Sequence, residues 1–266
     1  MVPRVMDIHF NQVLDALKPK RSPEEALQKH KSLIRRASPW RSQNHDTVKI
    51  LQTVGNWIMA PRSSLLVLQA RPRAQARVKE IATELIGQLH SKNVIWYLSS
   101  FNSEDDGAIS AMEVLKSLVF QSMKQAPELV TSEPGSFTAA KLHGSHTEDE
   151  WADLLCYVLG RLKTCFLIVD AEHVFGHVEE AKQLMGVFTG LMGRFQGMEA
   201  VLKLLVVSYC DDSEWVGGEA RLGKERMQVL VVNREAPVPP RRRKPGARTG
   251  IFRGKWDKIA SSTTPR

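Results

Sequence analysis

The chain has 266 residues, of which 42% are hydrophobic and 25% charged, so it is long enough to bury one substantial core. No stretch has the length and hydrophobicity of a membrane span. The net charge of +8 lies entirely in residues 234–266, which hold 10 of the 37 Lys+Arg and 2 of the 29 Asp+Glu, so the rest of the chain has 27 residues of each sign. The basic isoelectric point is therefore no guide to the partners of residues 1–233.

Residues 1–45 are predicted to form a helical N-terminal segment that is separate from the sheet. Its clearest helix start is Ser22, which suits an N-cap, followed by Pro23 at the first helical position and Glu25 in place to close a capping box. Charged residues interrupt the apolar ones in the first 20 positions, so the segment lacks the apolar core of a signal peptide.

The three cysteines, Cys156, Cys165 and Cys210, lie inside or beside apolar segments and lack the paired spacing of metal ligands. We therefore expect reduced thiols in an intracellular, cytoplasmic protein. His173 and His177 stand four residues apart, as two ligands on one helix face would. A glycine between them and the lack of an evident third ligand favour a loop without metal.

Short apolar runs alternate with amphipathic helical patterns between residues 46 and 233. Strands are predicted over residues 64–69, 93–99, 165–170, 201–208 and 227–232, and helices over residues 45–60, 76–89, 105–125, 148–159 and 179–195. Pro127 is expected to end the third helix, and Thr147 and Glu150 to form a capping box at the fourth. The alternation predicts an α/β domain over residues 46–233, with a three-layer, mostly parallel sheet, flanking helices and right-handed crossovers.

The apolar run at residues 165–170 ends abruptly in a carboxylate, Asp170. Open α/β sheets bind ligands beyond the carboxyl ends of their strands, and P-loop nucleotide hydrolases hold magnesium with an aspartate in this position. Asp170 is therefore the first candidate for a site residue.

Residues 46–210 resemble, in order and spacing, the nucleotide-binding domain of fungal signalling NTPases of the NACHT or STAND class, also described as nephrocystin-3-like N-terminal domains. The matching features are Asn56-Trp57 before the first strand, Trp96-Tyr97-Leu98 in the second, the helix at 112–118, a Walker B strand at 165–171 and a sensor strand at 204–208. The resemblance implies a P-loop NTPase-like fold, with ATP or ADP and magnesium as the family's ligands.

The phosphate loop departs from the family pattern. The resemblance places the conserved positions of G-x-x-x-x-G-K-[ST] on Ala70, Gln75, Ala76 and Arg77. The glycines of this motif let backbone N–H groups turn toward phosphate, while its lysine and hydroxyl contact phosphate and magnesium. None of these residue types is present, so neither a nucleotide cofactor nor its magnesium is expected to bind in the usual way.

Two further departures concern the Walker B and sensor strands. The acidic pair that the family carries after its aspartate falls on His173 and Val174, and Glu172 can compensate only if the turn differs. Tyr209 stands where the family usually has an arginine. Phosphoryl transfer depends on positioned charges, so losing the lysine, the metal ligand and the base together argues against an ATPase.

Arg71, Arg73 and Arg77 crowd the junction of the first strand and helix. Together with Asp170 they form a relic nucleotide site. They could hold an anion at the helix N-terminus without help from glycine. The alternative, which we prefer, is that they are solvated loop residues.

Residues 234–266 are rich in proline and arginine and are predicted to be a disordered tail. Its basic cluster is Arg241, Arg242, Arg243 and Lys244. Such a cluster can bind nucleic acid, serve as a nuclear import address or lie on acidic lipid. A solvated tail, or an out-of-frame or truncated terminus, explains it equally well.

Three hypotheses follow. The first is a non-catalytic, degenerate signalling-NTPase domain that acts as an interaction or regulatory module with protein partners, or is a truncated remnant. The second is a weak ATP/ADP-binding switch that works through non-standard contacts. The third is nucleic-acid binding through the basic tail.

Overall fold

The computed structural model describes residues 5–37, 45–71, 73–99, 110–132, 147–175, 177–209 and 226–233. Several predictions fall outside these ranges: the start of the helix expected from residue 105, Cys210, and the tail with Arg241, Arg242, Arg243 and Lys244. None of the helices within the ranges is long and apolar enough to cross a membrane.

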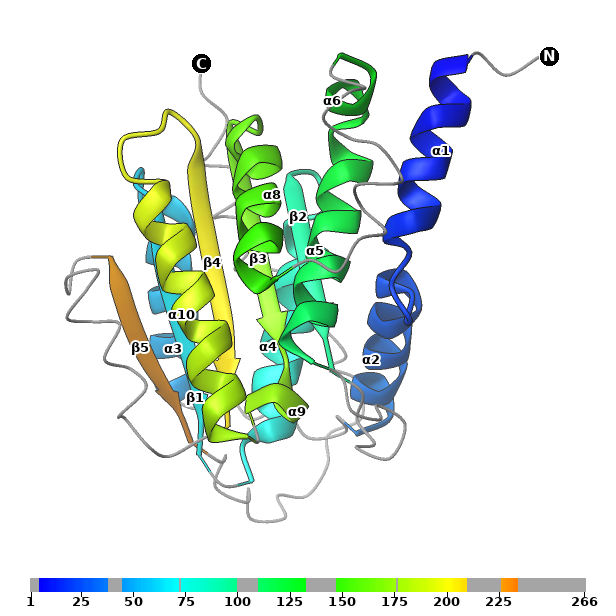
Figure 1. Cartoon of the computed structure of the whole chain (residues 1–266). Coiled ribbons are helices and arrows are strands. Elements are labelled where there is room, and N and C mark those ends of the chain that lie inside the picture. The colour runs from blue at the N-terminus through cyan, green and yellow to red at the C-terminus, as the bar shows by residue number, and fades with distance from the viewer. Residues whose placement is uncertain are drawn as a thin grey trace.

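Five parallel strands form one sheet in the order β2-β3-β4-β1-β5 (Figure 1). They are β1 (Ser64–Ala70), β2 (Asn93–Leu98), β3 (Thr164–Asp170), β4 (Val201–Ser208) and β5 (Met227–Val232). Nearly every residue of β3 and β4 is buried, because these strands have neighbours on both sides and helices above and below. This explains why their sequences are continuous apolar runs. All the strands run the same way, so their ends define a carboxyl edge and an amino edge of the sheet.

Helices cover both faces of the sheet, as Figure 1 shows. One face carries α1 (Val5–Leu17), α5 (Ala111–Gln125), α8 (Glu148–Gly160) and α10 (Val178–Arg194), and the other carries α2 (Pro23–Ala37), α3 (His45–Met59) and α4 (Gln75–Gln88). Successive β3 residues alternate between the two cores, with Leu167 in the first and Ile168 in the second. The predicted three-layer α/β fold is confirmed, and the arrangement is consistent with a P-loop NTPase-like fold.

The N-terminal helices are built into these layers, so the prediction that this segment is separate from the sheet is wrong for α1 and α2. Val13 and Leu17 of α1 are fully buried in the first core, whereas Ala26 and Leu27 of α2 belong to the second. α2 begins as predicted, since the hydroxyl of Ser22 accepts a hydrogen bond from the Glu25 N–H at 3.3 Å. The division of the chain into residues 1–45, 46–233 and 234–266 stays a prediction.

Two helix starts test the sequence analysis further. Thr147 and Glu150 form the predicted reciprocal capping box at α8. Pro127 is expected to end α5. The helix does end just before it, at Gln125, but Pro127 also begins the short helix α6 (Pro127–Ser132). Proline suits this position because the first helical residue needs no hydrogen bond from its nitrogen.

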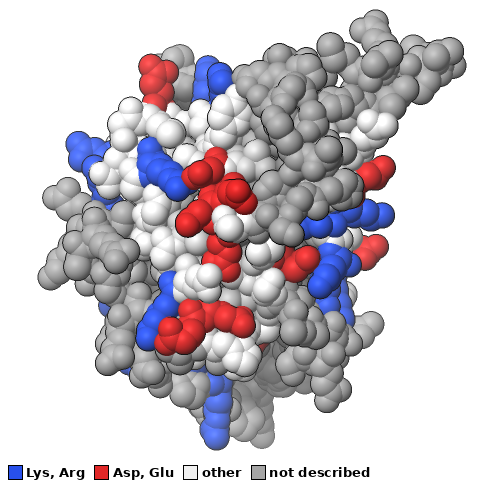
Figure 2. All heavy atoms as spheres, viewed as in Figure 1, with Lys and Arg blue, Asp and Glu red and all other residues white. Residues whose placement is uncertain are grey.

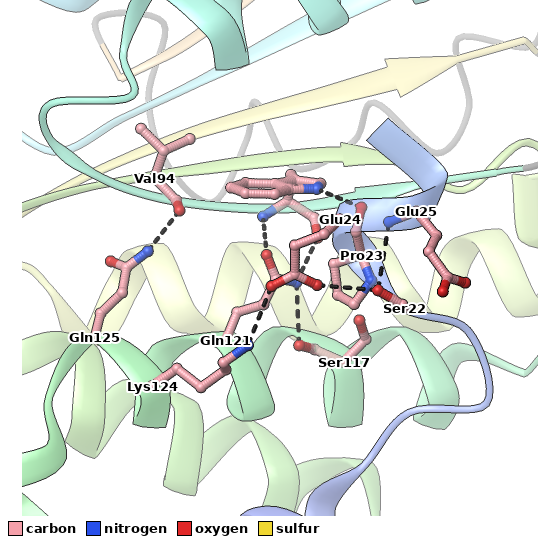
Figure 3. A network of polar contacts seen from close by, with 10 residues as sticks. Ser22, Pro23, Glu24, Glu25, Val94, Ser117, Gln121, Lys124 and Gln125 are labelled. Carbon is pink, nitrogen blue, oxygen red and sulfur yellow. Dashed lines mark hydrogen bonds and ion pairs between the residues drawn. The ribbon is translucent and has the colours of Figure 1, made fainter. Parts of the chain in front are cut away.

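Side chains of α5 cover the open edge of β2 (Figure 3). The Gln121 carboxamide accepts a hydrogen bond from the Trp96 N–H at 3.1 Å and donates one to the Trp96 carbonyl at 2.6 Å. Gln125 donates to the Val94 carbonyl at 2.6 Å, and the Trp96 indole donates to the Pro23 carbonyl at 3.1 Å. These side chains bond to backbone groups of β2 that another strand could otherwise pair with, and so they protect the open edge of the sheet.

Candidate functional site

Asp170 is the last residue of β3, and none of its surface is exposed. The hydroxyl of Tyr209, the residue that follows β4, donates a 2.9 Å hydrogen bond to Asp170 Oδ1. Burial first, and then the charges of Asp170 and Glu172, raise the pKa of Tyr209 well above its ordinary value. Tyr209 therefore remains a protonated donor to this carboxylate.

A lysine of α4 approaches Asp170, from the same layer against which Tyr209 packs. Lys79 lies near the start of α4, and its side chain is only 3% exposed. Its Nζ lies 2.6 Å from Glu172 Oε2 and 3.8 Å from Asp170 Oδ2. It also lies 5.8 Å from the centre of the Tyr209 ring. Helical side chains lean toward the N-terminus, so a lysine near the start of α4 reaches the carboxyl edge.

Glu172 is the first residue of the short helix α9 (Glu172–Phe175), and its side chain is 33% exposed. Sequence analysis allows it to stand in for the family's second acidic residue only if the turn differs. Here Glu172 and Asp170 share one ammonium, that of Lys79. The four residues Lys79, Asp170, Glu172 and Tyr209 are called the carboxyl-edge cluster below.

Backbone and histidine contacts fix the strand end that carries this cluster. Ser99, which follows β2, donates its N–H to the Asp170 carbonyl at 2.7 Å. Its hydroxyl lies 2.9 Å from Nδ1 of His173 in α9. His30 of α2 places Nε2 at 2.6 Å from the Ser99 carbonyl, and because a carbonyl only accepts, Nε2 carries the proton. The N-terminal helix α2 is thereby attached to the carboxyl edge.

In the described part of the connection between β1 and α4, backbone N–H groups bond to carbonyls of the same segment. The Ala74 N–H donates to the Arg71 carbonyl at 2.9 Å, and the N–H groups of Arg77 and Val78 donate to the Ala74 carbonyl at 3.0 and 3.1 Å. Arg73 has φ 69°, in the left-handed region that favours glycine. A phosphate cradle directs successive N–H groups at the ligand, whereas these donors serve the turn itself.

The three arginines that the sequence suggests as site residues lie at this junction, Arg71 and Arg73 before α4 and Arg77 near its start. Arg71 and Arg73 are exposed and Arg77 is half-buried. The Arg77 guanidinium donates to the carbonyl of Asn233, the residue after β5, at 3.4 Å. They lie at the same edge of the sheet as Asp170, where the structure also places Lys79, with its Nζ 3.8 Å from Asp170 Oδ2. Anion binding by the arginines stays a prediction.

The carboxyl-edge cluster does not fit a P-loop nucleotide with its magnesium. Ala76, at the position of the family's lysine, is exposed and carries no charge. Asp170, at the position of the family's metal ligand, already contacts a phenol and an ammonium. Across the described ranges, no group of three or more His, Cys, Asp and Glu side chains is arranged to hold a metal ion. No nucleotide-dependent step follows from this geometry.

Lys79 and Ser99 are not among the site residues predicted from the sequence, and Tyr209 is noted there only as a departure from the family pattern. One signal for Lys79 is present in the sequence. Lys79 follows Ala76 by three residues, so on a helix the two positions share a face. Lys79 therefore stands one turn beyond position 76, but it is buried whereas Ala76 is exposed.

A groove runs between α8 and α10 on the outer surface of the molecule. It comprises two hollows of about 520 and 410 Å³ that share Arg194. Gly186 and Gly190 line the larger one, and a Cβ added at either would meet nothing within 4 Å. Glu148 and Asp149 line it too, and burial followed by the charge of Asp149 raises the pKa of Glu148. Figure 2 shows acidic side chains gathered over α8 and α10 on this face.

No protein-family model matches the chain, and no curated protein matches it. The chain is similar to one in the structure of Drosophila ORC bound to GC-rich DNA and Cdc6, with a TM-score of 0.40 and 13% identity over 89% of this chain and 34% of that one. Another similar chain, from Drosophila ORC bound to AT-rich DNA and Cdc6, has a TM-score of 0.38 and 11% identity over 85% and 33%. The chain thus spans about a third of the length of these chains. Likeness at this level identifies neither a family nor a function.

Proposed function

We propose that this chain is a non-catalytic domain of P-loop NTPase-like architecture that acts as an interaction or regulatory module. The observation that carries the proposal is the engagement of Asp170, the residue expected to hold magnesium, by Tyr209 and Lys79. Phosphoryl transfer relies on a metal ion, a phosphate-binding lysine and an oriented nucleophile. The Ala74 N–H is bonded to the Arg71 carbonyl, and Asp170 is engaged by Tyr209 and Lys79, which leaves little of this machinery.

Descent from a fungal NACHT or STAND domain is part of this proposal. It rests on the order and spacing of the motifs between residues 46 and 210. An intracellular, cytoplasmic location is proposed as well, and the free, buried thiols of Cys156 and Cys165 support it.

The proposed partner is a protein, and the groove between α8 and α10 supports this choice. Its floor includes two glycines with open space above them, and its rim carries Glu148 and Asp149. Such a surface suits a partner segment with basic side chains, because complementary charge speeds and orients association. A lysine-rich peptide serves as the probe. It should bind the wild type and bind much more weakly to Glu148→Lys/Asp149→Lys, and equal binding to both would remove this support.

Thermal melting with and without millimolar ATP or ADP plus magnesium tests the proposed function. We expect the same melting temperature in every condition, because a ligand stabilises a protein only if it binds the native state. Asp170→Asn provides the matched control, since it keeps the shape of the side chain and removes its charge. A clear upward shift that is lost in Asp170→Asn would contradict the proposal and favour a weak ATP/ADP-binding switch.

Nucleic-acid binding through the tail is the second candidate, because residues 234–266 carry the whole net charge of +8. We expect any affinity for duplex DNA to fall steeply with salt, with a slope of about −0.9 per phosphate neutralised. Replacing Arg241, Arg242, Arg243 and Lys244 together by glutamine should flatten that slope. An unchanged slope would show that these four residues do not contact the phosphates.

A further inference from the structure

We propose that the ammonium of Lys79 takes the place of a divalent cation at the carboxyl edge, so that Asp170 and Glu172 form a latent cation site which removal of this one side chain opens. The inference deepens the proposed function, because it explains why the site takes no metal ion. It does not depend on which partner the domain binds.

The two carboxylates provide the chemistry that a divalent cation needs. Asp170 and Glu172 stand on either side of one residue, at the end of β3 and the start of α9, and both face the same ammonium. Two carboxylates that share a site repel each other unless a cation lies between them. Magnesium is commonly held by one or two carboxylates and completes its shell with water.

The position of the ammonium excludes a metal ion from these oxygens. Lys79 Nζ lies 2.6 Å from Glu172 Oε2. Metal–oxygen distances for magnesium and calcium are about 2.0 to 2.6 Å, so an ion bound to this oxygen would occupy the space of the ammonium. Bringing a second cation beside a side chain that is 3% exposed would also cost strong repulsion, because little water screens the charges.

Charge balance also favours binding of a divalent cation once the Lys79 ammonium is removed. The two carboxylates carry two negative charges and Lys79 returns one positive charge. Without Lys79 the pair would keep both negative charges, and a divalent cation would neutralise them. Glu172 is 33% exposed, so the variant offers an ion a path from solvent and room for water ligands.

The experiment uses the full-length chain with Lys79→Met, which keeps most of the side-chain length and removes the charge. Mn²⁺ is the probe, and the loss of its free-ion electron paramagnetic resonance signal measures binding. We expect Lys79→Met to bind one Mn²⁺ on the order of tenfold or more tightly than the wild type, because a unit charge beside the ion is removed. Magnesium should raise the melting temperature of the variant and leave that of the wild type unchanged, and EDTA should reverse the rise.

Two variants are the controls. Lys79→Met/Asp170→Asn should lose the gained affinity, since one of the two ligands is gone. Lys203→Met should gain none, because Lys203 is also buried but contacts a carbonyl and a hydroxyl instead of carboxylates.

Three outcomes would overturn the inference. The wild type could bind Mn²⁺ as tightly as Lys79→Met, or a folded Lys79→Met could gain no affinity. If Lys79→Met is unfolded without metal, magnesium, calcium or manganese must restore its cooperative melt, and failure of all three counts against the inference. Nucleotide is absent throughout, so a nucleotide-induced shift in the wild type would contradict the proposed function alone.

Discussion

Two buried lysines stand at opposite edges of the sheet, and their surroundings differ in kind. Lys79, at the carboxyl edge, lies against the carboxylates of Asp170 and Glu172. Lys203, near the start of β4 at the amino edge, is 1% exposed and donates to the Arg62 carbonyl at 2.6 Å and the Ser64 hydroxyl at 2.9 Å. Burial lowers the pKa of Lys203 from 10.5 to about 8.

Each lysine has a different role for the groups around it. At the amino edge the ammonium needs acceptors, and neutral ones serve, at the cost of a weaker hold on its proton. At the carboxyl edge it is the carboxylates that need a cation, and Lys79 supplies the charge. Lys203 can be replaced without leaving a charge behind, whereas Lys79 cannot.

The largest effect is expected from Lys79→Met in a buffer with EDTA. The variant removes the ammonium that lies beside the buried Asp170, so the free energy of unfolding should fall by about 3 kcal/mol. Urea denaturation measures the change. Adding Asp170→Asn should restore much of the loss, because the uncompensated charge is removed.

Lys203→Met is the matched variant at the other edge. Replacing it leaves no buried charge, so at pH 7 the free energy of unfolding should change by less than about 1 kcal/mol. Equal losses in the two variants would break the comparison, because they would show that the carboxylates do not distinguish the two sites.

The second effect concerns pH. Between about pH 8 and 10.5 the native state releases the Lys203 proton while the unfolded chain retains it. The unfolded state then binds more protons, so this group makes stability rise with pH, by about 2.5 kcal/mol over that window. Below pH 8 both states are charged and the contribution does not vary.

The buried thiol of Cys165 changes stability with pH in the direction opposite to Lys203. Burial raises the pKa of Cys165 from 9.0 to about 12, and the unfolded chain therefore loses that proton first and stability falls as pH rises above 9. Urea denaturation of the wild type and Lys203→Met over the same pH range cancels this contribution. The difference between the two proteins should change with pH, and a constant difference would mean that Lys203 titrates normally.

The strands and helices were predictable from sequence because each depends on a local pattern of apolar residues. The run that ends in Asp170 is a buried strand, as its composition predicts. The carboxyl-edge cluster was not predictable in the same way, because Lys79, Glu172 and Tyr209 come from three separate segments. A lysine in a helix is ordinarily solvated, and only the fold brings this one against a buried carboxylate.

A smaller effect is expected from Tyr209→Phe. The change removes the 2.9 Å hydrogen bond to Asp170 but leaves Lys79 in place, so the free energy of unfolding should fall by about 1.5 kcal/mol. Tyr157→Phe on α8 is the control, because its hydroxyl meets the Arg161 guanidinium at an exposed site and should contribute less than about 0.5 kcal/mol. Losses of similar size in urea denaturation would show that Asp170 does not depend on the phenol.

The smallest effect concerns the turn that leads into the helix of Lys79. Arg73 holds φ 69°, which strains a residue with a Cβ, so Arg73→Gly should raise the melting temperature and stabilise the protein by up to about 1 kcal/mol. Arg71→Gly should give no such gain, because among the described residues Arg73 alone combines a side chain with positive φ. Neither variant should gain affinity for ATP with magnesium, since Lys79 still occupies the site. Nucleotide binding by Arg73→Gly would show that the turn, and not the ammonium of Lys79, keeps nucleotide out. The contrast between the buried lysines at the two edges would then not explain why nucleotide does not bind.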